Sequence, residues 1–327
     1  MRNLVAAMII VLGSFGAQGA FAQSAADAEL IYEGCRGEVV TIADLQWPSA
    51  SILAHIHHQL FRSEFNCDAQ VVQSDLANVA ATIDAAQEPK IVPELWVNRV
   101  AGQWNKLGEA QRAFMAASSF DATTLEGWFV PSKVTADFPQ LGAAEKLADM
   151  PGLYERDKIR FITCPEKWAC HVLNDNLIRA FGLQNVFEVV VPQSRFEMDQ
   201  MIGQIISARE PAVFYYWQPN AVLHQFDFAA LSLGDYVADA YPCLAQSSCG
   251  APKRSDFPSE QIGLVAASDV RADMPELLGY LRRATMPIAV MNELLAVQER
   301  QAFTAQQTAT HFIEAFPETW QAWVSAP

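Results

Sequence analysis

The residues with the most distinctive chemistry in this chain are its tryptophans. Eight occur in 327 residues, and five of them stand where the sequence pattern predicts that a strand ends or a helix begins. These five are Trp47, Trp96, Trp128, Trp168 and Trp217. An aromatic face attracts a cation through the ring quadrupole, by about 1–2 kcal/mol for each ring once water is excluded. A trimethylammonium group has no N–H to donate, so the five rings predict a site for such a group. The alternative for each ring is packing in the core.

Two acidic residues accompany these rings. Glu94 and Glu126 each precede a tryptophan of this set by two residues, and the period of two in a strand puts Glu94 on the side of Trp96. A carboxylate buried beside the cation would favour a ligand that has no carboxylate of its own, such as choline or trimethylamine N-oxide. The alternative for both residues is a solvated surface glutamate.

Three histidines, His55, His57 and His58, raise the question of a metal site. His55 and His58 share a helix face, but no acid or cysteine stands at ligand spacing, so we expect no metal. We instead place the histidines on the outer face of an amphipathic helix. We also expect no cofactor and no enzyme activity, because the chain has no Gly-x-Ser-x-Gly elbow, no phosphate loop and no dinucleotide fingerprint.

The elements that must position these residues alternate between β-branched runs and helical segments. Strands are predicted at 38–43, 69–73 and 91–97, with helices at 49–65 and 76–86, and the segment 159–217 repeats this order. Repeated β-α-β order predicts a mainly parallel sheet covered by helices. The length favours two lobes. We therefore expect two α/β lobes joined by crossing strands, one of them at 127–131, with a ligand cleft between the lobes.

The first 22 residues have the pattern of a secretory signal peptide. Arg2 gives a positive start, residues 4–12 form a short apolar run, and Ala20-Phe21-Ala22 has the small-x-small form of a cleavage site. The run is too short to span a bilayer, so we expect a periplasmic protein. The predicted division after this signal (1–22) is a first lobe at 23–127, a second lobe at 128–230, and a return to the first lobe at 231–327 that includes a stapled excursion at 234–258.

Charge and cysteine content narrow the class of protein further. The net charge of −15 excludes nucleic acid as a partner, because no basic patch is present to neutralise phosphates. We expect a monomer. Six cysteines in an exported chain predict disulfides, although the sequence leaves their connectivity open. Cys164/Cys170 and Cys243/Cys249 are local pairs with one shared spacing, which leaves Cys35 with Cys67. Zinc is the alternative, but neither local pair has the usual short ligand spacing.

Several short stretches resemble one known family when taken in order. They are Trp47-Pro48-Ser49, Pro93-Glu94-Leu95-Trp96, Gly127-Trp128-Phe129-Val130-Pro131, Cys164-Pro165-Glu166-Lys167-Trp168-Ala169-Cys170, Tyr215-Tyr216-Trp217-Gln218-Pro219 and the ending Ala315-Phe316-Pro317-Glu318-Thr319-Trp320-Gln321-Ala322-Trp323. With this spacing, the chain is similar to the substrate-binding proteins of glycine betaine/choline-type ABC importers from about Val39 to Trp323. The resemblance implies a type II-like periplasmic binding protein with two lobes, whose aromatic box holds a methylated ammonium ligand. It also implies an ABC permease in the inner membrane as partner, and a sensory receptor for the same ligands is the alternative.

The resemblance also suggests how the far end of the ligand is held. In betaine-binding relatives a carboxylate is received by backbone amides in a cysteine-closed loop, and the matching residues here are Trp168, Ala169 and Cys170. A predicted helix begins there, and a helix N-terminus favours an anion. Two positions depart from the pattern: Val100 stands where some betaine binders have histidine, and Ser49 where some choline binders have aspartate. Glycine betaine, choline, trimethylamine N-oxide, carnitine and dimethylsulfoniopropionate therefore all stay open as ligands.

Overall fold

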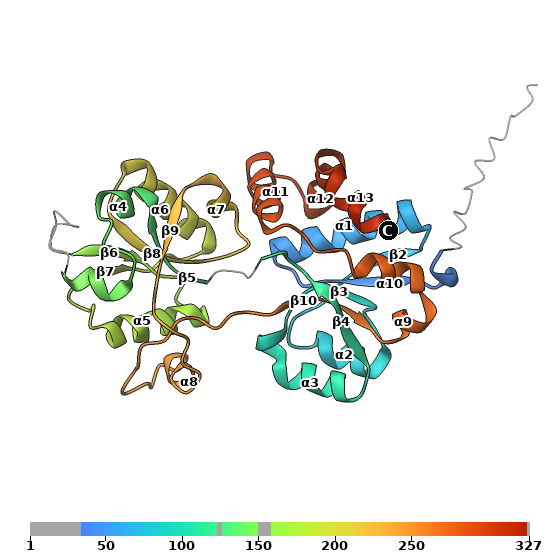
Figure 1. Ribbon diagram of the computed structural model, residues 1–327, viewed down its shortest axis with the longest axis horizontal. Coiled ribbons are helices and arrows are strands. Elements are labelled where there is room, and N and C mark those ends of the chain that lie inside the picture. Colours follow the sequence, from blue (N-terminus) through green and yellow to red (C-terminus); the bar gives the residue numbers. More distant parts are fainter. Residues whose placement is uncertain (1–33, 123–125, 150–157, 326–327) are drawn as a thin grey trace, which may run out of the picture. The chain divides into compact units, whose positions relative to one another are not determined.

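The computed structural model describes residues 34–122, 126–149 and 158–325. The predicted signal peptide lies outside these residues. The described chain forms two five-stranded sheets, β2-β1-β3-β10-β4 and β7-β6-β8-β5-β9, each covered by helices (Figure 1). The prediction of a two-lobe α/β binding-protein fold is confirmed. Among the described residues, no helix combines the length and apolar character that a membrane crossing requires.

The first lobe is built around a sheet whose central strands are completely buried. Its strands are β1 (Val40–Asp44), β2 (Ala69–Gln73), β3 (Ile91–Trp96), β4 (Ala113–Ser118) and β10 (Ile262–Ala267). Strands β1, β2 and β3 are parallel, whereas β10 runs antiparallel to both β3 and β4. All six residues of β3 and of β10 are buried, because helices pack on both faces of the sheet and continuous apolar runs suit such strands.

Helices from both halves of the sequence cover this sheet. They are α1 (Pro48–Phe65), α2 (Val79–Ala86), α3 (Ala101–Glu109), α9 (Asp269–Asp273), α10 (Pro275–Leu281), α11 (Ile288–Gln301), α12 (Ala305–Ala315) and α13 (Pro317–Val324), with 3-10 turns η1 (Gly34–Gly37) and η2 (Val97–Val100). Proline at the first position starts α1, where its missing N–H costs nothing. A capping box of Thr304 and Gln307 starts α12. Helix α12 packs along α1, and α11 packs on α7 of the second sheet.

The second lobe has one core beneath its own sheet. Its strands are β5 (Glu126–Pro131), β6 (Ile159–Ile162), β7 (Phe187–Val190), β8 (Ala212–Trp217) and β9 (Phe228–Leu231), and its helices are α4 (Ser132–Asp137), α5 (Ala169–Phe181), α6 (Arg195–Ala208), α7 (Ala221–Gln225) and α8 (Tyr241–Leu244), with the turn η3 (Ala144–Asp149). Helix α5 is followed by its C-cap Gly182, whose φ of 71° glycine adopts at little cost. Ser194 caps α6, because its hydroxyl oxygen accepts a hydrogen bond from the amide of Glu197.

Two details differ from the sequence-based expectation. The segment 127–131 does not cross between lobes, because it belongs to β5 and pairs with β8 and β9 inside the second sheet. The excursion 234–258 packs on the second lobe and not on the first. Leu244 and Phe257 belong to the second core, and the side chain of Asn176 on α5 donates to the carbonyl of Leu244 at 2.9 Å. The cysteine spacing identified a staple but carried no information on which lobe it covers.

The disulfide pairs are the three favoured from the sequence, namely Cys35–Cys67, Cys164–Cys170 and Cys243–Cys249. The first joins η1 to Cys67, two residues after the C-terminal end of α1. The second closes the loop that leads into α5.

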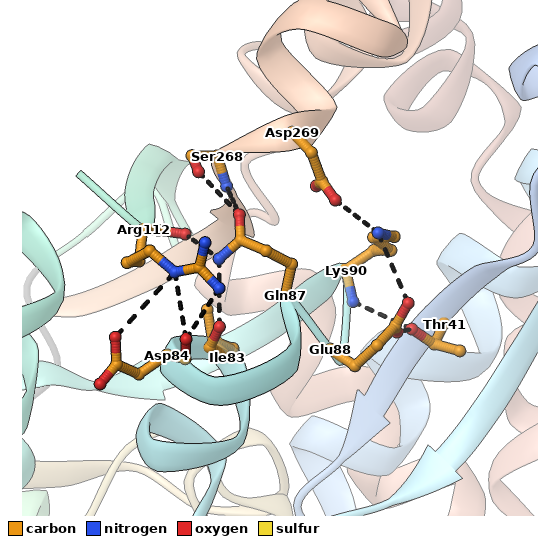
Figure 2. Close-up of polar contacts among 9 residues, drawn as sticks. All are labelled: Thr41, Ile83, Asp84, Gln87, Glu88, Lys90, Arg112, Ser268 and Asp269. Carbon is orange, nitrogen blue, oxygen red and sulfur yellow. Dashed lines mark hydrogen bonds and ion pairs between the residues drawn. The ribbon is translucent and has the colours of Figure 1, made fainter. Parts of the chain in front are cut away.

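A polar network fastens the first sheet at the beginning of β3 (Figure 2). Lys90 forms ion pairs with Asp269 and Glu88, and the hydroxyl of Thr41 on β1 donates to Glu88. Gln87 accepts from the hydroxyl of Ser268 at 2.7 Å. These contacts tie β1, β3 and the end of β10 together. They lie at the opposite end of β3 from Trp96, which leaves the carboxyl end of this strand for other chemistry.

Candidate functional site

Two of the predicted tryptophans meet at the carboxyl end of the first sheet. Trp47 stands immediately before α1, and Trp96 is the last residue of β3. Their indole N–H groups both donate to one oxygen, Oε1 of Glu94, at 2.7 and 3.0 Å. The hydroxyl of Ser49 donates to the same oxygen at 3.1 Å. One carboxyl group therefore holds both rings by their N–H edges, which keeps the ring faces clear of this contact.

Glu94 is not a surface residue. Its side chain is fully buried, and burial raises its pKa to about 7, opposed by the hydrogen bonds from Trp47, Ser49 and Trp96. Oε2 of the same carboxyl group is also buried, and it has no hydrogen-bond partner among the described residues. A buried unpartnered oxygen costs free energy unless something compensates it. The side of Glu94 was predictable from the period of the strand, but its burial was not.

Trp96 already has a cation on its ring. The guanidinium carbon of Arg99 lies 4.5 Å from the ring centroid, which is within cation–π range. Arg99 also pairs with Glu260 at 3.3 Å and with Glu126 at 3.5 Å. Arg99 was missed at the sequence level, although its spacing of three residues from Trp96 was a usable signal. The contact shows that this ring can receive a positive charge.

Glu126, besides its contact with Arg99, bonds to a tyrosine. Its Oε1 accepts the hydroxyl of Tyr215 at 2.5 Å, and its side chain is largely buried. It is therefore not a solvated surface residue, and among the described residues it forms no hydrogen bond with a tryptophan. Tyr215 lies directly opposite Trp128 in the ladder of β5 and β8. Glu126 is connected to the ring face of Trp96 through Arg99.

A second group of rings lies on the second lobe. The centroids of Trp168 and Trp217 are 5.6 Å apart with the planes at 67°, an edge-to-face arrangement. Tyr216 lies 5.0 Å and Tyr215 6.1 Å from Trp217. Trp168 is 36 % exposed, which is high for so large an apolar side chain. The two tyrosines were not singled out from the sequence, although they directly precede Trp217.

The loop closed by Cys164 and Cys170 leads into α5, and its amides behave unequally. The amide of Trp168 donates to the carbonyl of Pro165 at 2.9 Å. The amides of Ala169 and Cys170 have no acceptor within the described part of the chain, as expected for the first turn of a helix. Two of the three predicted anion-binding amides are thus open to a ligand in this structure.

Trp128 does not offer a ring face to a solute. Its side chain is 0 % exposed in the core of the second lobe, 4.9 Å from Phe161, and its N–H donates to Asn174 at 2.9 Å. Trp128 lies on β5 inside the sheet rather than on a crossing strand, so packing is its role. Trp104, Trp320 and Trp323 also pack against cores, as expected from the sequence.

The histidine expectation was wrong in one respect. His57 does not lie on an outer face, because it is buried and its Nδ1 is 2.7 Å from the hydroxyl of Tyr280. Burial lowers the pKa of His57 to about 3, so its imidazole is neutral. Across the ranges 34–122, 126–149 and 158–325, no group of three His, Cys, Asp or Glu side chains is arranged to hold a metal ion.

Comparison with known proteins decides the family. The model of OpuAC, the substrate-binding domain of ABC-type glycine betaine transport systems, matches residues 38–315. The chain belongs to this family. OpuAC proteins are substrate-binding components of transporters, which agrees with the resemblance found in the sequence. No curated protein sequence matches the chain.

Solved structures support the same fold. The glycine betaine/L-proline-binding protein ProX from Borrelia burgdorferi is 14% identical, with a TM-score of 0.58, and the match covers 88% of this chain and 97% of that one. Lactococcal OpuAC in complex with glycine betaine is 16% identical with a TM-score of 0.56, and the match covers 88% and 100%. An ABC-transporter choline-binding protein in complex with choline is 13% identical with a TM-score of 0.56, over 88% and 91%. At these identities the likeness concerns the fold alone.

Proposed function

We propose that this OpuAC-family protein is the periplasmic substrate-binding component of an ABC transporter for a methylated ammonium compound, with glycine betaine as the preferred ligand. The observation that carries the proposal is the pair Trp47 and Trp96, held by their N–H edges on the buried Glu94. Arg99 on the face of Trp96 supports it, since a guanidinium occupies the kind of position that a ligand cation would take. Trp168 and Trp217 supply the rings of the second lobe.

The binding energy expected from these rings is sufficient for a transport protein. Each ring contributes about 1–2 kcal/mol to a desolvated cation. Four rings would therefore supply a large part of the roughly 8 kcal/mol that corresponds to micromolar binding. In the proposed closed state the ligand contacts rings of both lobes, and closure is a hinge motion of the kind known for periplasmic binding proteins.

The negative end of the ligand is assigned to the start of α5. The open amides of Ala169 and Cys170 and the dipole of a helix of 13 residues favour a carboxylate at this position. The hydroxyl of Ser49 donates its hydrogen bond to Glu94, so Ser49 does not replace the aspartate found in some choline binders. These two observations support a zwitterion with a quaternary ammonium at one end and a carboxylate at the other, which is the chemistry of a betaine.

Choline is the second candidate, because of Glu94. A buried carboxyl group behind two rings favours a positive ligand whether or not the ligand has a carboxylate. Trimethylamine N-oxide belongs to the same class. Binding affinities for this panel distinguish the candidates, since only a betaine uses both the rings and the amides.

Calorimetry with purified protein tests the proposal. Glycine betaine, choline, carnitine, trimethylamine N-oxide and dimethylsulfoniopropionate are titrated into the wild type and into Trp96→Ala, Trp217→Ala and the control Trp104→Ala. We expect at least one ligand to bind, and each cage variant to lose about 1–2 kcal/mol while the control stays within 0.5 kcal/mol, as an approximate bound. Binding of none of the ligands would overturn the proposal. Unchanged affinity in both cage variants would remove these rings from the site.

A further inference from the structure

The carboxyl group behind Trp47 and Trp96 is used in an unusual way. All three of its hydrogen bonds, from two indoles and the hydroxyl of Ser49, go to Oε1. Oε2 is buried and has no partner within the described ranges. A fully satisfied buried acid would need no further explanation, whereas this one keeps one oxygen uncompensated at the carboxyl end of β3.

Within the part of the chain that the structure describes, no positive side chain forms an ion pair with Glu94. Charged or titratable groups on the neighbouring elements include Asp44 at the end of β1, His55 and His57 on α1, Arg99 on η2 and Glu260 before β10. Asp44 accepts from Ser51 and Gln46, His57 bonds to Tyr280, and Arg99 pairs with Glu126 and Glu260. None of these groups forms an ion pair or hydrogen bond with Glu94 in the described structure. At the other end of β3, Lys90 pairs with Asp269 and Glu88.

We propose that Glu94 is the counter-charge of the cation site, and that it acts through Trp47 and Trp96 rather than by touching the ligand. This inference rests on the proposed function, and it adds a residue that determines the affinity of the site for a positively charged ligand. A negative acceptor on an indole N–H pushes electron density into the ring, and hydrogen-bonded groups polarise one another in this way. The ring faces become more negative and attract a cation more strongly. The charge of Glu94 also attracts the cation through space, because little water screens the two charges from each other at this buried position.

The arrangement links ligand binding to a proton. Burial raises the pKa of Glu94 to about 7, so the counter-charge is present above pH 7 and disappears as the pH falls below it. A bound cation stabilises the ionised form, which lowers the pKa of Glu94 and releases a proton. Affinity for the cation should therefore rise with pH between about 5.5 and 8. If the rise is about tenfold, the complex releases roughly half a proton at pH 6.5.

The wild type alone provides the first test. Glycine betaine is titrated by calorimetry at pH 5.5, 6.5 and 8, and at pH 6.5 in two buffers with different enthalpies of protonation. We expect roughly tenfold tighter binding at pH 8 than at pH 5.5, with proton release at pH 6.5. A constant affinity with no proton exchange would overturn the inference while leaving the proposed function intact. Absence of binding of all five ligands of the panel at pH 8 would overturn both.

Two variants and one ligand analogue assign the effect to this residue. Glu94→Gln keeps an oxygen that can accept the indole N–H groups but removes the charge, so its affinity should be roughly tenfold lower at pH 8 and independent of pH. Glu260→Gln, which removes the buried partner of Arg99, should retain the pH dependence. In the analogue 3,3-dimethylbutanoate, carbon replaces the quaternary nitrogen of glycine betaine, so the shape is kept and the positive charge is lost. Glu94→Gln should not weaken the binding of this analogue. Loss of the pH dependence in Glu260→Gln with its retention in Glu94→Gln would contradict the proposal.

Discussion

Replacing Glu94 by glutamine should favour the fold more at pH 8 than at pH 5, even as it weakens the cation site. The pKa of Glu94 rises from its ordinary value of 4.5 to about 7 in the folded protein. One pKa unit corresponds to about 1.4 kcal/mol, so keeping Glu94 ionised in the fold costs about 3 kcal/mol. For an acid with a raised folded pKa, stability is greatest below the unfolded pKa and is lost as the pH rises through 7. Most of this loss, about 2–3 kcal/mol, falls between pH 5 and pH 8.

The assay is urea unfolding of the wild type and Glu94→Gln at pH 5 and pH 8. The amide of glutamine adds its own pH-independent cost at the buried Oε2 position, so the informative quantity is how the difference in unfolding free energy changes with pH. We expect this difference to move by about 2–3 kcal/mol in favour of glutamine from pH 5 to pH 8. Titration of every other group is common to both proteins and cancels. The exposed Glu109→Gln serves as the control and should show no such change.

A change of less than about 0.5 kcal/mol between the two pH values would refute the reasoning, because it would mean that Glu94 is not held at a cost in its ionised form. A move in the opposite direction would show that the charge stabilises the fold. Either result would also remove the physical basis for an affinity that depends on pH between about 5.5 and 8.

Three further predictions concern the neighbouring structure. Trp128→Phe should lower the unfolding free energy by about 1–3 kcal/mol, because it loses the bond to Asn174 and core volume, yet leave ligand affinity unchanged in calorimetry. If Trp128→Phe reduced the binding free energy by more than the unfolding free energy, the assignment of Trp128 to the core would be contradicted. His57→Gln should reduce acid sensitivity, since the neutral His57 makes the wild type lose about 2 kcal/mol as the pH falls from 6.5 to 5, and equal pH profiles in urea unfolding would argue against this. Replacing Cys164 and Cys170 together by alanine should reduce the affinity for glycine betaine more than the affinity for choline, as measured by calorimetry. An equal loss of affinity for both ligands would show that this loop does not bind the carboxylate.

Much of the fold followed from the sequence, because its determinants are local. The β-α-β order of β1, α1, β2, α2 and β3 follows from short segments, each with the apolar periodicity of a strand or of a helix. Trp47 was expected at the start of a helix and Trp96 at the end of a strand, and both lie there in the structure. The approximate side of Glu94 also followed from the period of two in β3.

The remaining features depend on contacts between distant segments, which a local pattern does not encode. The expectation for Trp128 failed because its place on β5 does not reveal that Phe161 and Phe187 enclose its ring. The expectation for His57 failed because Tyr280, far along the chain, covers that face of α1. The burial of Glu94 has the same origin.

The most direct test of a cation held by tryptophans is the crystal structure of the protein with glycine betaine. The account predicts that the quaternary nitrogen lies within about 6 Å of the ring centroids of Trp47 or Trp96 and of Trp168 or Trp217, with the carboxylate at the amides of Ala169 and Cys170. A ligand bound elsewhere, or bound with these four rings out of contact, would contradict it.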